Sequence, residues 1–391
     1  MVLGTPTGGV RKKLSDKAES IRKAGGDITI LIVRGIREKV AIESDYRVIE
    51  VDHTLSAFVA RLPLLWRLSV IMEQRKIYET ISHYLQDKNC DIVLMRYPVA
   101  DFFLHHFMKK FSARFKIVFE HNTLEEEELR LRSTNSFWYR YFLWGESFFG
   151  RSVRRAASGM IGVTGEICDR QIQRTGIPCR SVSISNGIDI MRVKLKSRNE
   201  RPSPGSLNVL FLAGSPAAWH GVDILLNSLK RYSGPTKICC YIAGDIEERL
   251  TSVARAMENV VLLNHQANED LDALVDKCDI GIGSLALFRN QMKEACTLKV
   301  REYWARGLPF VVGYDDTDLM HNKSMEPFFL KVMIPPDALE PSFDFEQVVD
   351  FARTALQIPD IHEVMRSHAM HQISYGAKGR AYMNFFKSIH S

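Results

Sequence analysis

The sequence predicts an α/β protein built from two Rossmann-like domains, and three observations support this. Short apolar runs typical of buried parallel strands alternate with helical patterns along most of the chain. A polar stretch with two prolines, at 197–206, interrupts the alternation near the middle, and the same alternation resumes after it. A chain of 391 residues can form two domains of about 150–200 residues each. We therefore assign 1–196 to an N-terminal domain and 207–374 to a C-terminal one.

The composition is that of a globular protein, with 46% apolar and 25% charged residues. A net charge of +6 suits a negatively charged ligand or an anionic membrane surface, and no nucleic-acid-binding module is present. The seven cysteines form no C-x-x-C pair, and their apolar neighbours predict reduced thiols in a cytoplasmic protein. Without an apolar run of about 18 residues or a signal peptide, we expect any membrane contact to be peripheral, at the inner face.

The first domain opens with Gly8 and Gly9 in a predicted loop, followed by a helix at about 13–24 and a strand at 28–33. Loop, helix and strand in this order begin a doubly wound fold. The strand expected before the loop is reduced to Val2 and Leu3, so we expect the natural start to lie upstream. Further strands of this domain are predicted at 47–51, 91–98, 116–121, 157–163 and 182–189.

His121 ends the strand at 116–121, and polar groups at the carboxyl ends of parallel strands lie at the ligand-binding edge of a sheet. His121 is therefore a candidate to contact a substrate, although a histidine that only caps a loop fits equally well. The acidic run at 125–128 is interpreted as a solvated helix start. The aromatic and basic segment at 137–155 is either a helix packed on the sheet or an amphipathic helix on a membrane surface.

The second domain repeats the pattern, and its first strand ends at Gly214. Its other strands are predicted at 238–245, 260–264, 279–285 and 310–313, with helices between them and a helical tail from about 347. Asp316 and Asp318 form a D-x-D pattern, which holds a metal in some enzymes. Here it follows a strand of the second sheet, so we interpret it as an acidic loop and predict no metal.

Glu294 and Glu302 lie eight positions apart in the segment at 294–313. On one helix this spacing places both carboxylates on the same side. Gly307 and Pro309 would end that helix, and an apolar strand follows. Two such acids could accept hydrogen bonds from the hydroxyls of a ribose and a hexose; the alternative is a solvated amphipathic helix.

The same segment resembles a family signature. The pattern E-x7-E, with LK-x-x-EY-x-A-x-G-x-P at its end, is similar to that of the retaining glycosyltransferases of family 4, which have the GT-B fold. The matching residues are Glu294, Leu298, Lys299, Glu302, Tyr303, Ala305, Gly307 and Pro309. The resemblance implies two domains facing a central cleft, the first for the acceptor and the second for a nucleotide sugar. It also implies that a final helix, about 375–391, returns to the first domain.

The resemblance assigns a role to each candidate residue. Glu302 would bind the ribose, and Glu294 and His121 the transferred sugar. Thr297 and Leu298, at the helix start, would face the diphosphate. Gly8 and Gly9 would approach the donor phosphate or the acceptor. The nucleotide sugar is a substrate, and no cofactor is implied.

The sequence departs from the family at the phosphate clamp, where an arginine and a lysine usually follow the first strand of the second domain. Here that strand ends in Gly214 and Ser215, and His220 stands at the place of the lysine. A neutral histidine supplies little charge, and Arg289 and Lys299 could compensate. The W-H-G-V-D loop around His220 resembles a subgroup that acts on bacterial surface polysaccharides.

We therefore predict a metal-independent hexosyltransferase that moves a sugar from a nucleotide sugar to a glycan or lipid-linked acceptor with retention. Bacterial surface polysaccharide biosynthesis is the expected setting. The altered clamp leaves two alternatives open. One is a non-catalytic, nucleotide-binding partner of a polysaccharide assembly complex; the other is a nucleotide-sugar epimerase with the same fold.

Overall fold

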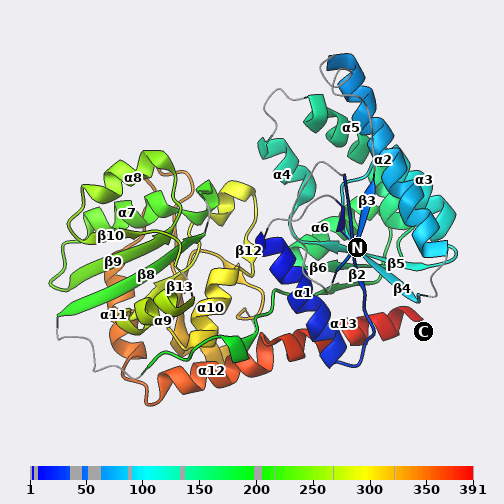
Figure 1. Cartoon of the computed structure of the whole chain (residues 1–391). Helices are drawn as coiled ribbons and strands as arrows, with labels where there is room; N and C mark the ends of the chain where they lie inside the picture. Colours follow the sequence, from blue (N-terminus) through cyan, green and yellow to red (C-terminus); the bar gives the residue numbers. More distant parts are fainter. Residues whose placement is uncertain are drawn as a thin grey trace. The chain divides into compact units, whose positions relative to one another are not determined.

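The protein, described as a computed structural model, is an α/β chain that forms two compact units (Figure 1). The first comprises Met1–Ile184 and Gly379–Ser391, and the second Ser185–Lys378. The structure describes residues 2–3, 8–35, 46–51, 63–86, 90–132, 137–197, 205–214, 216–266, 268–320 and 322–390. The predicted fold class is confirmed, since parallel sheets with helices on both faces occur in both units.

The strands of the first unit form two parallel sheets, ordered β1-β2-β3 and β4-β5-β6-β7. The first sheet contains β1 (Val2–Leu3), β2 (Ile30–Gly35) and β3 (Tyr46–Val51). The second contains β4 (Ile92–Arg96), β5 (Lys116–His121), β6 (Gly159–Gly162) and β7 (Ser181–Ser183). The strand predicted at 182–189 is therefore much shorter than expected, because residues from Ser185 onward belong to the second unit.

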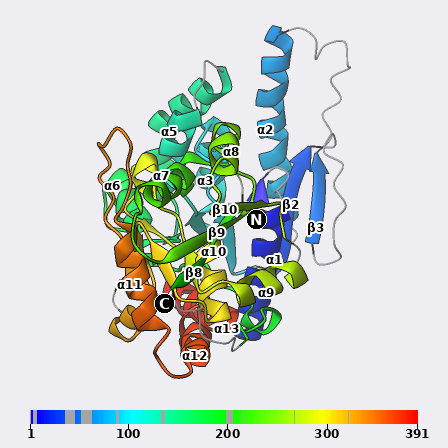
Figure 2. The same cartoon turned by 90° about the vertical axis from the view of Figure 1, so that its left-hand side faces the viewer.

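Helices cover both faces of the first unit. The helices are α1 (Gly8–Lys23), α2 (Pro63–Gln86), α3 (Phe102–Phe111), α4 (Glu125–Arg132), α5 (Phe137–Arg155), α6 (Gly165–Thr175) and α13 (Tyr375–His390). One core joins α2, α3 and α5 to the sheets, and α2 lies alongside β2 and β3 (Figure 2). A second core joins α1 and the end of α13 to the opposite face.

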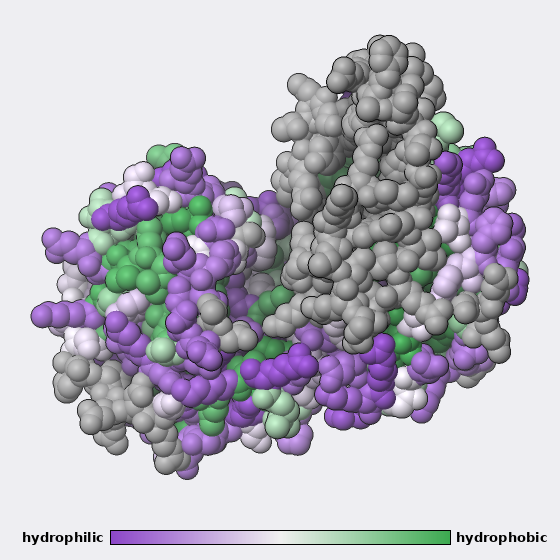
Figure 3. All heavy atoms as spheres, viewed as in Figure 1, coloured by the Kyte–Doolittle hydropathy of each residue, from purple (hydrophilic) through white to green (hydrophobic). Residues whose placement is uncertain are grey.

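The second unit contains a six-stranded parallel sheet, ordered β10-β9-β8-β11-β13-β15. Its strands are β8 (Ser206–Gly214), β9 (Lys237–Gly244), β10 (Val260–Leu263), β11 (Ile280–Ile282), β13 (Phe310–Val312) and β15 (Phe329–Lys331). A separate parallel pair joins β12 (Glu294–Ala295) to β14 (Asp315–Asp316). The visible face of this unit is mostly hydrophilic, with hydrophobic residues gathered over β8 to β10 (Figure 3).

Two layers of helices enclose the second sheet. Their members are α7 (Val222–Arg231), α8 (Glu248–Arg255), α9 (Asn268–Lys277), α10 (Leu298–Arg306), α11 (Phe345–Ala355) and α12 (Ile361–Gln372). Short 3-10 helices are η2 (Ile190–Arg192), η3 (Ala218–His220), η4 (Leu287–Asn290) and η5 (Lys323–Phe328). The core on one face comes from α7, α8 and α11, and the core on the other face from α9, α10 and α12.

The segment at 185–197 is tied to the second unit by hydrogen bonds. Asn186 Nδ2 donates to the Cys296 carbonyl at 2.8 Å, and the Lys196 amide donates to the Arg306 carbonyl at 2.9 Å. The linker predicted at 197–206 consequently falls inside the second unit, and 198–204 lie outside the described residues. Among the described helices, none is both long and apolar enough to cross a membrane.

Candidate functional site

The two acids of the E-x7-E pattern do not share a helix, so that prediction was wrong. Thr297 has an extended backbone, with φ −71° and ψ 142°, and is the N-cap of α10, which therefore begins at Leu298. Glu294 lies earlier, on β12, where it pairs with Asp315 of β14 and is buried. Only Glu302 is on α10, where its carboxylate accepts a hydrogen bond from Arg306 Nε at 3.2 Å. The two carboxylates are thus held by different elements.

Lys299, in the first turn of α10, is a buried cation. The residue is 9% exposed, and its Nζ lies 3.1 Å from His220 Nδ1 and 4.3 Å from the centre of the Phe211 ring. The described part of the chain places no carboxylate against this ammonium. Burial lowers the pKa of Lys299 to about 7. A buried ammonium beside a helix start, without a counter-charge, is suited to binding an anion.

His220 is fixed by the turn that carries it. Its backbone carbonyl accepts from the Leu285 amide at 3.0 Å, and its Nδ1 lies 3.3 Å from Ser284 Oγ. Gly221 follows in the left-handed conformation, with φ +73°, and a Cβ there would lie 2.8 Å from Leu285 Cβ. Burial and, to a lesser degree, Lys299 lower the pKa of His220 to about 3. The imidazole is therefore neutral and accepts from the ammonium of Lys299.

Arg289, the other cation expected to compensate for the altered clamp, is already paired. Its guanidinium donates to both carboxylate oxygens of Asp223, at 2.9 and 2.7 Å, and to the Ala218 carbonyl at 2.8 Å. The hydrogen bonds that Arg289 donates to Asp223 raise the pKa of Arg289. The pair links η4 to the turn that carries His220, so Arg289 stabilises the conformation of that turn.

The D-x-D pattern forms part of a buried ion-pair network. Arg301 is completely buried, and its guanidinium donates to Asp316 at 2.8 and 3.0 Å and to Asp318 at 2.6 Å. Asp318 also accepts from Lys378 Nζ at 2.8 Å. Both carboxylates are therefore engaged by protein cations, and no group of three potential metal ligands occurs among the described residues.

The remaining candidates of the second unit lie around the start of α10 or at the end of β8. Thr297 Oγ1 is 2.8 Å from the hydroxyl of Tyr314, and Leu298 is largely exposed beside it. Gly214 ends β8 with φ +73°, a conformation that suits glycine. Ser215, next to it, lies outside the described residues.

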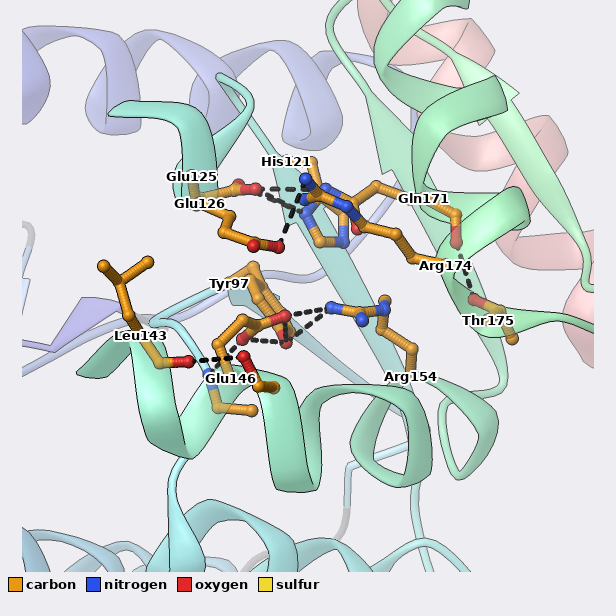
Figure 4. A network of polar contacts seen from close by, with 12 residues as sticks. Tyr97, His121, Glu125, Glu126, Leu143, Glu146, Arg154, Gln171, Arg174 and Thr175 are labelled. Atoms are coloured by element: carbon orange, nitrogen blue, oxygen red, sulfur yellow. Dashed lines mark hydrogen bonds and ion pairs between the residues drawn. The ribbon is translucent and has the colours of Figure 1, made fainter. Parts of the chain in front are cut away.

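His121 ends β5 in the first unit and is completely buried (Figure 4). Its Nδ1 lies 3.1 and 3.2 Å from the two oxygens of Glu125, and its ring lies against that of Tyr97, with centroids 4.6 Å apart. Its Nε2 is buried and has no hydrogen-bond partner in the described part of the protein. Glu125 is therefore a pairing residue for His121 and not the solvated helix start that we expected.

Gly8 and Gly9 are the first two residues of α1 and not part of a loop, which corrects the prediction for this segment. Further along α1, Lys13 Nζ donates to Asn122 Oδ1 at 2.6 Å, and Lys17 pairs with Glu120. These contacts join α1 to the carboxyl end of β5, at the two residues that flank His121.

A second buried network lies beside His121, and our sequence-based prediction missed it. Glu146, on α5, accepts from the Tyr97 hydroxyl at 2.8 Å, from the Ala100 amide at 2.7 Å and from Arg154. Arg154 also donates to the Tyr97 hydroxyl at 3.0 Å. Two charged residues eight positions apart on the inner side of an aromatic helix were the available signal, as Figure 4 shows. The network fixes the tyrosine that packs on His121.

No protein-family model matches the sequence, and no curated protein is significantly similar to it. Solved structures, in contrast, match over the whole chain. A glycosyltransferase from Rickettsia africae is 15% identical, with 100% of this chain and 98% of that one covered and a TM-score of 0.63. WaaG, a glycosyltransferase involved in lipopolysaccharide biosynthesis, is 16% identical, with 98% and 99% covered and a TM-score of 0.59.

Anabaena Alr3699/HepE, solved in complex with UDP and glucose, is 15% identical, with 99% of both chains covered and a TM-score of 0.57. At these identities the comparisons establish a shared fold and leave the activity open. The fold is GT-B, as the signature at 294–309 led us to expect.

Proposed function

We propose that this GT-B chain is a glycosyltransferase that moves a sugar from a nucleotide sugar to a glycan or lipid-linked acceptor. The observation that carries the proposal is the buried ammonium of Lys299, which has His220 and Phe211 as neighbours and no carboxylate among the described residues. A diphosphate supplies the negative charge that this site lacks. HepE, which has the same fold, was solved with UDP and glucose, so UDP is the first nucleotide to test.

In this proposal the charge missing from the usual clamp comes from α10. Lys299 stabilises the diphosphate as it leaves, because an ammonium in a site of low dielectric acts strongly on developing negative charge. The start of α10, at Thr297 and Leu298, adds the positive end of the helix dipole. Arg289 contributes indirectly, through the turn that it fastens, and Gly214 leaves room beside the phosphates.

The two acids divide the remaining donor contacts. Glu302 accepts from the ribose hydroxyls, and Glu294 from hydroxyls of the transferred sugar. Within the first unit, His121 is the residue proposed to contact a sugar. Placing the acids on separate elements lets each reach its own part of the donor. The proposed reaction is a metal-independent hexosyl transfer with retention, of the family 4 type, in bacterial surface polysaccharide biosynthesis.

A transfer assay tests this assignment. Wild-type protein is incubated with a panel of nucleotide sugars and with short glycan or polyprenyl-linked acceptors, and release of nucleoside diphosphate is followed. We expect release that depends on the acceptor, and a loss of about 100-fold or more in Glu302→Ala. Activity of Glu302→Ala within about threefold of wild type would overturn the role of Glu302.

The non-catalytic alternative rests on the missing arginine and lysine of the clamp. It predicts that the protein binds UDP but releases none from a UDP-sugar, with or without acceptor. An epimerase would instead convert the UDP-sugar into an epimeric UDP-sugar without net release of UDP, which chromatography of the nucleotide sugars in the same incubation detects. The same assay therefore separates the three hypotheses.

The exposed side of α5 supports a lipid-linked acceptor. Trp144 and Phe148 are 53% and 66% exposed, and Arg140, Arg151 and Arg155 are exposed on the same side of the helix. Aromatic side chains between arginines are typical of helices that lie in the headgroup layer of an anionic membrane. One side of α5 then packs on the sheet while the other contacts the membrane, and the enzyme acts peripherally at the inner face of the membrane.

Sedimentation with vesicles tests the membrane face. We expect the protein to bind vesicles that contain anionic phospholipid and not purely zwitterionic ones. The double variant Trp144→Ser with Phe148→Ser should lose binding about tenfold or more. Equal binding of this variant and wild type would exclude α5 as the contact.

A further inference from the structure

Glu125 accepts hydrogen bonds from two buried side chains that come from different elements. His121, at the end of β5, places Nδ1 at 3.1 and 3.2 Å from the two carboxylate oxygens. Gln171, on α6, donates from Nε2 at 3.1 Å. One carboxylate on α4 therefore sets the direction of both the imidazole and the amide, as Figure 4 shows.

This carboxylate also selects the tautomer of His121. An ionised carboxylate can only accept hydrogen bonds, so the proton of the neutral ring lies on Nδ1 and the lone pair on Nε2. The Tyr97 ring packs against the imidazole at 4.6 Å, and Glu146 and Arg154 hold the Tyr97 hydroxyl. The ring cannot turn without breaking contacts on its face and on its edge.

Two acceptors remain without a donor around this carboxylate. His121 Nε2 and Gln171 Oε1 are both buried and have no hydrogen-bond partner in the described part of the protein. Buried polar atoms are rarely left unpaired, so a group that can donate belongs beside them. Sugar hydroxyls donate in this way, and neither a phosphate nor a carboxylate does.

We propose that Glu125 is a positioning residue, which presents His121 Nε2 and Gln171 Oε1 as acceptors for the hydroxyls of the sugar substrate. The inference rests on the proposed function for the identity of the ligand as a sugar. It adds Glu125 and Gln171 to the site and assigns the tautomer of His121. Glu125 acts through His121 and Gln171, without itself touching the sugar.

NMR of protein labelled with 15N-histidine tests the tautomer without any need for activity. The His121 signals are assigned by comparison with His121→Asn. In wild type we expect a protonated Nδ1 and an unprotonated Nε2. In Glu125→Ala the proton should move to Nε2 or distribute over both nitrogens. A protonated Nε2 in neutral wild-type His121, or an unchanged tautomer in Glu125→Ala, would overturn the positioning role.

Glu127→Ala is the matched control. Glu127 lies on the same helix, carries the same charge and pairs with Arg174 of α6 at 2.6 and 2.8 Å. Among the described residues it has no contact with His121, so its removal should weaken the link between α4 and α6 and leave the tautomer unchanged. A tautomer change in Glu127→Ala equal to that in Glu125→Ala would show that general loosening of α4, not Glu125, is responsible.

Ligand addition and kinetics separate this inference from the proposed function. UDP-glucose should shift the Nε2 resonance of wild type, whereas UDP should not; no shift with the sugar would overturn the hydroxyl contact. If transfer is detected, we expect Glu125→Ala to lower kcat about tenfold or more while its affinity for UDP stays within twofold of wild type. If no donor is ever turned over but the tautomer result holds, only the proposed reaction fails.

Discussion

Two basic residues of α10, Lys299 and Arg301, show how the same element can provide both stability and a binding site. Both are buried, at 9% and 0% exposed. Arg301 is bound by the carboxylates of Asp316 and Asp318, which outweigh the effect of burial and raise its pKa. Lys299 faces a neutral histidine and an aromatic ring, and burial lowers its pKa. Arg301 is therefore paired with two carboxylates, whereas Lys299 faces none in the part of the chain that the structure describes.

The largest expected effect is on stability, at the satisfied cation. Arg301→Met leaves two buried carboxylates without their main partner, so we expect the free energy of unfolding to fall by about 3–5 kcal/mol. Chemical denaturation measures this. A loss under about 1 kcal/mol would mean that the network around Arg301 contributes little, and the contrast with Lys299 would disappear.

The second prediction concerns pH at the unsatisfied cation. UDP should bind the protonated form of Lys299, whose pKa in the free protein is about 7. Above this value each binding event must take up a proton, so affinity should fall by up to about tenfold per pH unit. The phosphates of UDP are already fully ionised there, because a phosphate loses its second proton near pH 6.

Calorimetry in buffers of different ionisation enthalpy counts the protons taken up. We expect uptake approaching one proton at about pH 8 in wild type and none in Lys299→Met. Equal uptake in both proteins would assign the proton to another group.

The third prediction is that removing Lys299 stabilises the protein, whereas removing Arg301 destabilises it. Lys299 has a pKa of about 7 in the folded protein and its usual higher value when unfolded. The unfolded state therefore binds more protons above pH 7, and stability rises from there toward about pH 10. Below pH 7 the folded protein bears the full cost of the buried charge. Lys299→Met should thus increase the free energy of unfolding at pH 6, by about 1–2 kcal/mol. A decrease would show that the ammonium has a stabilising partner.

The smallest effect is expected at Arg289, whose charge Asp223 already neutralises. Arg289→Met should weaken UDP binding by no more than about threefold, through loss of the fastened turn. Binding curves for Arg289→Met and Lys299→Met under the same conditions give the comparison. A loss at Arg289 as large as that at Lys299 would make the two cations equal members of the clamp.

The fold was predictable because local sequence patterns indicate where strands and helices form. The alternation of apolar and amphipathic segments located β4, β5, β8 and β9 within a few residues. The site was predictable only in part. The helix start at Thr297 depends on its extended backbone and on the pairing of β12 with β14, which separated Glu294 from α10. No local pattern encodes that pairing.

The other features of the site that the sequence did not predict depend on contacts between residues far apart in the chain. Lys299 meets His220 across 79 positions of sequence, and Gln171 meets Glu125 across 46. The acidic run at 125–128 suggested exposure because its helix has no apolar stripe, yet β5 and α6 supply partners for Glu125 and Glu127. The charge of these glutamates did not reveal that they are partly buried and paired with other elements.

We propose above all that the ammonium of Lys299, which faces no carboxylate among the described residues, binds the diphosphate of the donor. Calorimetric titration of UDP into wild type and Lys299→Met at pH 6.5, with both proteins shown to be folded, tests it most directly. The account predicts that Lys299→Met binds UDP at least about tenfold more weakly, since a charge-assisted hydrogen bond to phosphate contributes about 1.5–3 kcal/mol. Equal affinities in the two proteins would contradict it.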